Sequence, residues 1–144
     1  MKIVTTIILL TLFLIAASNA LANPKTTAEI RDNTVESLII GLSSDNIGLK
    51  SSSAYMIGEL RLSQALIPLL RILHTEKNEG LRITAALALY KIGSPIAIYA
   101  VKQAIRFDDS ERVSKLCASF YSEYQRNKII DEEINVDVSK TALN

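Results

Sequence analysis

The chain has 144 residues, of which 49% are hydrophobic, and it carries 16 basic and 15 acidic side chains. This length is enough for one domain of modest size and too short for two independent hydrophobic cores. The near-neutral charge argues against sequence-independent binding of nucleic acid, because such binding relies on basic groups that neutralise phosphates.

The first 22 residues have the pattern of a secretory signal peptide. Lys2 gives a positive start, residues 3–17 are apolar except for three threonines, and residues 20–22 supply the small residues of a cleavage site. Residues 18–20 form a second possible site. The apolar run is shorter than the roughly 20 residues that a membrane-spanning helix needs. We therefore expect cleavage and no stable membrane span in the mature protein, with an uncleaved N-terminal anchor as the alternative.

Removal of residues 1–22 leaves a chain that begins at Asn23 and carries 15 basic and 15 acidic side chains, because Lys2 is lost. Cys117 is the only cysteine, so no disulfide can form within the chain, and the sequence has no Asn-x-Ser/Thr glycosylation motif. These features favour a periplasmic or secreted protein of a bacterium.

Apolar residues at helical spacing predict an all-α protein with six helices. Leu81, Ala85 and Leu89 show the i, i+4, i+8 pattern of one helix face. Ser94 and Pro95 fit the capped start of a helix that follows a glycine. The expected helices form three antiparallel pairs, namely 26–42 with 47–60, 64–74 with 79–92, and 96–106 with 111–126.

The sequence repeats itself at an offset of 32 residues. Residues 46–77 align with residues 78–109, and apolar or small residues recur at helical spacing. A period of 20–50 residues indicates a solenoid, in which each helix pair buries its apolar stripe against the next pair. The identical residues are Asn46/Asn78, Gly48/Gly80, Leu49/Leu81, Ala54/Ala86 and Ala65/Ala97.

Two segments carry a family resemblance. Residues 65–70 read Ala-Leu-Ile-Pro-Leu-Leu, and residues 81–93 read Leu-Arg-Ile-Thr-Ala-Ala-Leu-Ala-Leu-Tyr-Lys-Ile-Gly. This pattern resembles the HEAT-like repeat, in the short bacterial form named after phycobilisome lyases, over about residues 35–125. Tyr90 and Arg61 stand where this family prefers glycine. The resemblance implies an α-solenoid (α-α superhelix) of about three antiparallel helix pairs in a domain of residues 23–126.

The second helix of each unit is expected to divide into a core face and an outward face. Counted from Leu49, Leu81 and Val113 as position one, positions 1, 5, 6, 8, 9 and 12 are expected in the core. Small residues such as Ala54 and Ala86 are expected to let neighbouring helices approach closely. The cluster of Cys117, Phe120, Tyr121 and Tyr124 is expected to cap the end of the stack, with the tyrosine hydroxyl groups towards water.

The last 18 residues, 127–144, form a polar tail that we expect to be mobile. The tail contains apolar residues that can dock on the last helix, namely Ile129, Ile130, Ile134, Val136 and Val138.

The sequence offers no catalytic, cofactor or metal site. His74 is the only histidine and is expected at a helix end, and Cys117 falls on a packing position. Lys50 and Arg82 recur at one repeat position. We expect each to pair with an acid of the turn before it, Asp45 or Glu79, while a basic ladder that faces a ligand is the alternative.

The outward positions of the second helices suggest a partner site. Such positions lie on the concave side in this family, and adjacent helices can join them into one patch. The alternative is that the tail or the first helix covers this patch. The candidate partner-binding residues are Tyr55, Ile83, Leu87, Lys91 and Leu116.

These expectations combine into an exported, non-catalytic module that binds a protein or peptide and uses no cofactor. Two alternatives remain open. One is an accessory subunit anchored in the membrane by residues 1–22, and the other is a lyase-type repeat enzyme or chaperone, which the resemblance alone suggests.

Overall fold

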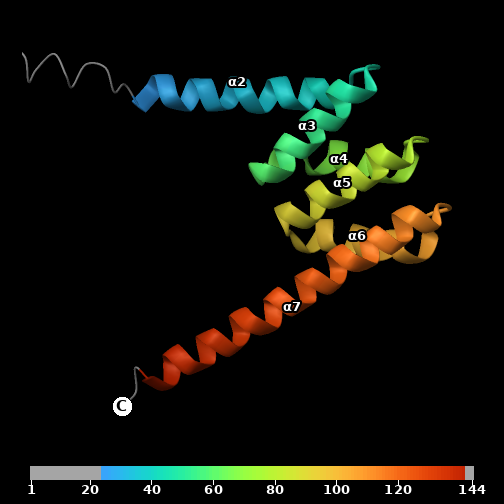
Figure 1. Ribbon diagram of the computed structural model, residues 1–144. Helices are drawn as coiled ribbons and strands as arrows, with labels where there is room; N and C mark the ends of the chain where they lie inside the picture. The colour runs from blue at the N-terminus through green and yellow to red at the C-terminus, as the bar shows by residue number, and fades with distance from the viewer. Residues whose placement is uncertain (1–23, 142–144) are drawn as a thin grey trace, which may run out of the picture. The chain divides into compact units, whose positions relative to one another are not determined.

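The computed structural model describes the backbone of residues 24–141 and the side chains of residues 32–134. The expected signal peptide lies outside the described residues. The chain divides into two compact units, Met1–Thr34 and Val35–Asn144, and the fold discussed below is that of the second unit. The elements, labelled in Figure 1, are α2 (Pro24–Leu42), α3 (Ile47–Glu59), η1 (Ser63–Ala65), α4 (Leu66–Thr75), α5 (Glu79–Ile92), α6 (Pro95–Phe107) and α7 (Glu111–Thr141).

The helices begin at polar caps that the repeat reproduces. The side chains of Asn46 and Asn78, which are 32 residues apart, accept hydrogen bonds from the backbone N–H groups of Leu49 and Leu81 at 3.0 and 3.1 Å. At the next helix, the Ser94 side chain accepts from the Ala97 N–H, and Pro95 follows it at the first helical position. The expected helix starts at 47, 79 and 96 therefore agree with the structure to within one residue.

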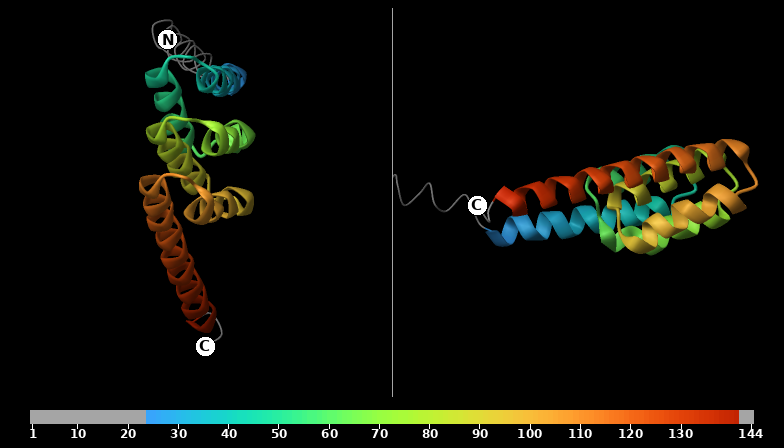
Figure 2. Two further views of the ribbon diagram at one scale, coloured as in Figure 1. Left: turned by 90° about the vertical axis from the view of Figure 1, so that its right-hand side faces the viewer. Right: turned by 90° about the horizontal axis from the view of Figure 1, so that it is seen from below.

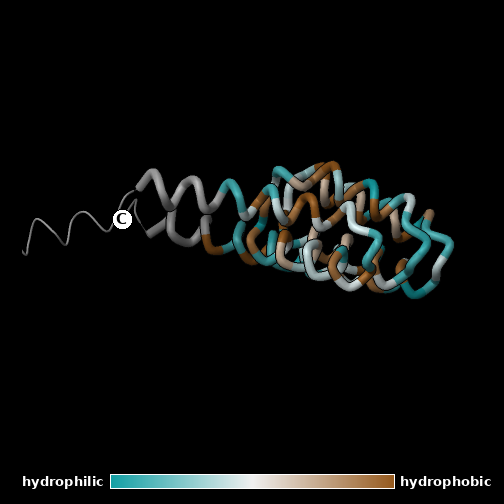
Figure 3. Tube along the Cα trace, turned by 90° about the horizontal axis from the view of Figure 1, so that it is seen from above, coloured by the Kyte–Doolittle hydropathy of each residue, from teal (hydrophilic) through white to brown (hydrophobic). Residues whose placement is uncertain are grey.

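The helices of the second unit form two layers (Figure 2). The helices α4 and α6 lie in one layer, and α3, α5 and α7 lie in the other. Within the second layer α3 packs on α5 and α5 packs on α7, while α4–α5 and α6–α7 form antiparallel pairs. Apolar and polar residues alternate along the helices, and the connectors at one end of the layers are largely polar (Figure 3). The arrangement confirms the predicted α-solenoid.

The core lies between the layers and between successive units. Ile57, Leu69, Leu89 and Val101 are completely buried in it, together with small residues of α5. Two helices approach closely at Gly58 of α3, where a Cβ atom would lie 2.7 Å from the Cα of Ala88. Alanine and glycine at these positions therefore allow α3 and α5 to pack with their backbones nearly in contact, as the repeat pattern predicts.

The first repeat unit, which contains α3, differs from the predicted core pattern. Leu49, Met56 and Leu60 occupy core positions of the repeat, yet 52%, 43% and 50% of their surfaces are exposed. The equivalent face of α5, which includes Leu81 and Ala88, is buried because it contacts the helix of the preceding unit. No described helix covers the equivalent face of α3, so the prediction was wrong for these three residues, whereas Ser53, Ala54 and Ile57 are buried as predicted.

The last helix is longer than expected. It continues as α7 to Thr141, whereas the sequence predicted its end at residue 126. Ile129, Ile130 and Ile134 belong to this helix and are about half exposed, so they do not dock on it as a returning tail. The sequence analysis missed this part of the helix because it relied on apolar periodicity, and a helix exposed to solvent on all sides shows little of it.

Candidate functional site

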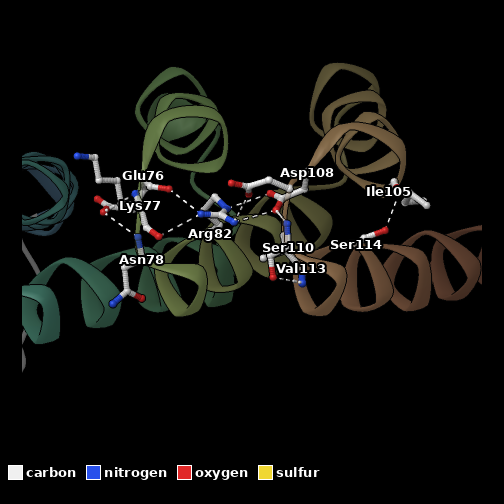
Figure 4. A network of polar contacts seen from close by, with 10 residues as sticks. Glu76, Lys77, Asn78, Arg82, Ile105, Asp108, Ser110, Val113 and Ser114 are labelled. Carbon is white, nitrogen blue, oxygen red and sulfur yellow. Dashed lines mark hydrogen bonds and ion pairs between the residues drawn. The ribbon is translucent and has the colours of Figure 1, made fainter.

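A cluster of polar contacts surrounds Arg82 where the α4–α5 connector meets the α6–α7 connector (Figure 4). The Arg82 Nε donates to Asp108 Oδ2 at 2.9 Å, and Nη2 donates to Asp108 Oδ1 and Asp109 Oδ1, both at 2.8 Å. Nη1 donates to the carbonyl oxygens of Glu76 and Lys77 at 2.9 and 3.2 Å. All five N–H donors of a guanidinium are therefore used within the protein.

Burial and charge shape the protonation of this cluster. Burial by itself would raise the pKa of Asp108, but the hydrogen bonds from Arg82 and from the Ser110 N–H outweigh it, and the pKa lies below its ordinary value. The same bond to Asp108 raises the pKa of Arg82. Both groups are therefore charged at neutral pH and hold the α4–α5 connector against the α6–α7 connector.

The cluster repeats once along the stack. The Lys50 Nζ lies 3.1 Å from Glu76 Oε2, and the sequence separation of 26 residues is that of Arg82 and Asp108. Each base thus pairs with an acid of the following connector, and the predicted pairing with Asp45 or Glu79 was wrong. The connectors meet because each unit is stacked on the one before it. A ladder that faces a ligand is also contradicted for Arg82, which is 6% exposed and has no donor left.

The two side chains with potential reactivity lie in structural positions. Cys117 is completely buried, and this burial raises the pKa of its thiol to about 11, so the thiol is uncharged and inaccessible at neutral pH. His74 is exposed in the last turn of α4. Within the described residues, no group of three or more His, Cys, Asp or Glu side chains gathers as a metal site requires. No described helix is long and apolar enough to cross a membrane.

The five residues of the predicted partner site lie on α3, α5 and α7, and we call them the ridge. Tyr55 is 48% exposed and lies beneath Lys91, whose Nζ is 5.2 Å from the ring centroid. Lys91 also forms an ion pair with Glu59. The hydrogen bond to Glu59 and its negative charge raise the pKa of Tyr55. The structure therefore brings Tyr55 and Lys91 together.

The other three ridge residues are more buried than expected. Ile83 is half-buried and packs against the core, and Leu87 and Leu116 are also half-buried. The ridge is consequently a narrow apolar strip beside a polar centre formed by Tyr55, Glu59 and Lys91. Helical spacing identified the outward direction of these side chains, but the amount of each that neighbours cover depends on how closely the helices pack.

An open cavity next to the ridge was not anticipated. It has a volume of about 540 Å³ and is lined by residues at the ends of α3 and α5 and by α7. Tyr90 lies on its wall and stacks on Phe120, with ring centroids 5.8 Å apart. The signal for this feature was the tyrosine at position 90, where the family pattern prefers glycine. The lining residues are Gly58, Glu59, Arg61, Tyr90, Lys91, Ile92, Gly93, Tyr124 and Asn127.

The α4/α6 layer carries a second surface that the sequence analysis missed. Neither helix contains an acidic residue, although both contain basic ones. The large apolar side chains Ile67, Ile96 and Tyr99 are 66%, 60% and 62% exposed on these helices. We call this surface the basic face and define it by Ile67, Arg71, Ile96, Tyr99, Lys102 and Arg106.

Two layers of antiparallel helices with a repeat of 32 residues define the class of protein as an α-solenoid. A family model for HEAT repeats matches residues 35–119, which is more than half of the chain. The chain therefore belongs to the HEAT repeat family. No match is found among curated proteins. HEAT repeats generally mediate interactions between proteins.

Proposed function

We propose that the protein is an exported, non-catalytic module that binds a protein or peptide partner through the ridge. The observation that carries this proposal is that Tyr55 is exposed and contacts both Lys91 and Glu59. Tyrosine is a favoured anchor of interfaces between proteins.

The surroundings of the ridge support this role. One alternative was that the C-terminal segment folds back and covers the ridge. Instead, residues 127–134 continue α7 as exposed helix. Leu87 and Leu116 then remain partly open on adjacent helices, and a partner can bury what is left of their apolar surface.

The non-catalytic part of the proposal rests on the described titratable groups. Arg82 and Asp108 are committed to each other, and the Cys117 thiol is buried. A catalytic site needs titratable groups that converge on a pocket and are available to a substrate. A lyase-type activity therefore has no observation in its favour here.

The ridge is tested by capture of partners from the exported fraction of producing cells. Leu87→Glu adds a charge at the centre of the strip and is expected to abolish capture of proteins that the unaltered chain retains, with helicity unchanged by circular dichroism. Met56→Glu, which alters an exposed apolar residue of α3 outside the ridge, is the matched control and should capture normally. Equal capture by both variants would contradict the proposal.

The proposal of export is tested by the mass of the protein isolated from producing cells. A chain that begins at Asn23 is expected, or at Leu21 if the alternative cleavage site is used. A chain that retains residues 1–22 would support the anchored accessory subunit in its place.

A further inference from the structure

Two cations of the basic face, Lys102 and Arg106, contact aromatic rings. The Lys102 Nζ lies 5.5 Å from the centroid of the Tyr121 ring, and the Arg106 guanidinium lies 5.7 Å from that of the Phe107 ring. Among the described residues, neither of these cations nor Arg71 forms an ion pair with a carboxylate. By contrast, the other layer pairs its exposed charges with one another, as in Lys115–Glu111 and Arg126–Glu123.

The two helices present this face in register. Ile67 and Tyr99 are separated by the repeat of 32 residues, as are His74 and Arg106, and all four side chains are exposed. Apolar side chains therefore lie towards the N-terminal ends of α4 and α6, and basic ones towards their C-terminal ends. Such a face suits an amphipathic helix that combines apolar and acidic side chains.

The C-terminal part of α7 has this complementary chemistry. Residues 127–134 are all exposed and include Ile130 and Ile134, which share one helix face at a spacing of four. Asp131 and Glu133 flank this apolar pair on either side. We call residues 127–141 the acidic extension.

The acidic extension cannot reach the basic face of its own molecule while α7 stays helical. The helix has 31 residues, which corresponds to about 46 Å at 1.5 Å per residue. Its C-terminal half leads away from α4 and α6 in both perpendicular views (Figures 1 and 2). An occupant with this chemistry must therefore come from another molecule.

We propose that two copies of the chain associate by placing the acidic extension of one on the basic face of the other. Ile130 and Ile134 pack against Ile67, Ile96 and Tyr99, while Asp131 and Glu133 lie near Arg71, Lys102 and Arg106. Contact between two acidic extensions is disfavoured because it brings carboxylates together, and contact between two basic faces is disfavoured in the same way.

This inference is independent of the ridge, which lies on the other layer. It uses α4, α6 and the end of α7, whereas the proposed partner site uses α3, α5 and the first half of α7. Failure of partner capture and failure of self-association are therefore separate results.

A charge exchange between two variants tests the proposal. Variant one carries Lys102→Glu and Arg106→Glu, and variant two carries Asp131→Lys and Glu133→Lys. In sedimentation velocity of the protein in the form that cells export, each variant alone is expected to weaken self-association by at least about tenfold in Kd, because like charges then meet. An equimolar mixture should recover association, since both contacts in the mixed pair join opposite charges.

The controls separate this result from a general effect of charge. Arg112→Glu with Lys115→Glu changes two exposed cations of α7 outside both surfaces and should associate as the unaltered chain does. Circular dichroism confirms that each variant folds. A mixture that stays dissociated overturns the proposal. So does an unaltered chain that is monomeric but binds vesicles with anionic phosphatidylglycerol through Lys102 and Arg106, because the basic face then serves a lipid surface.

Discussion

The two layers of the stack are built from the same repeat and yet present different surfaces. In the layer of α3, α5 and α7, exposed charges of both signs pair with each other, and the apolar side chains of the ridge are half-buried. In the layer of α4 and α6, the charges are all basic and the apolar side chains are among the most exposed of the described residues. The repeat thus constrains what packs inside and leaves each outer face free to differ.

The Arg82 cluster joins the α4–α5 connector to the α6–α7 connector, so its loss is expected to have the largest effect. Arg82→Met leaves Asp108 buried without its cation and removes donors from two carbonyl groups. We expect a loss of about 3–5 kcal/mol in the free energy of unfolding, as for other broken buried ion pairs. Urea denaturation followed by circular dichroism measures it.

Lys50→Met is the matched control for this change. Lys50 and Glu76 are both about one-fifth exposed, so solvent weakens their attraction, and a loss of at most about 1 kcal/mol is expected. Equal losses for the two variants would show that the Arg82 cluster does not join the two connectors in the way described.

The next largest effect on stability is expected from equivalent core positions of the first and second repeat units. Leu81 is 2% exposed, and Leu81→Ala is expected to cost about 2–5 kcal/mol of unfolding free energy. Leu49 occupies the same repeat position but is 52% exposed, and Leu49→Ala should change the free energy by no more than about 0.5 kcal/mol. A large loss for Leu49→Ala would mean that another element covers this face in solution.

The smallest expected effect is the change in stability when the pH is lowered and Asp108 becomes protonated. Because the pKa of Asp108 is lower in the folded chain than in the unfolded chain, its contribution to stability is complete above the unfolded value, which is about 3.9. This contribution is lost as the pH falls through the folded value. Asp108→Asn is therefore expected to be less stable than the unaltered chain at neutral pH and to lose less stability on acidification. Thermal unfolding at a series of pH values tests this, and parallel curves for the two chains would contradict it.

The sequence was sufficient for the features that depend on local spacing. The helix start at Ser94 followed from its cap residue, the starts at 47 and 79 followed from helical spacing, and burial of Leu81, Leu89 and Cys117 followed from the repeat. These properties are set by residues within one or two turns, or by their equivalents in the next unit.

Features that depend on contacts between units were missed. The pairing of Arg82 with Asp108 requires two connectors to meet across 26 residues, and the exposure of Leu49 depends on what precedes its unit. The helical acidic extension was missed because its polar surface has no core to face. The sequence already shows that α4 and α6 contain no acidic residue. The basic face can be recognised only once the structure places the two helices in one layer.

The basic face and the ridge are proposed to have separate roles, and amide hydrogen exchange at low and high protein concentration tests this separation most directly. If copies associate as proposed, raising the concentration will slow exchange in α4, α6 and the acidic extension, and it will leave α3 and α5 unchanged around Tyr55 and Leu87. Protection that appears on α3 and α5 and spares α4 and α6 would contradict the account.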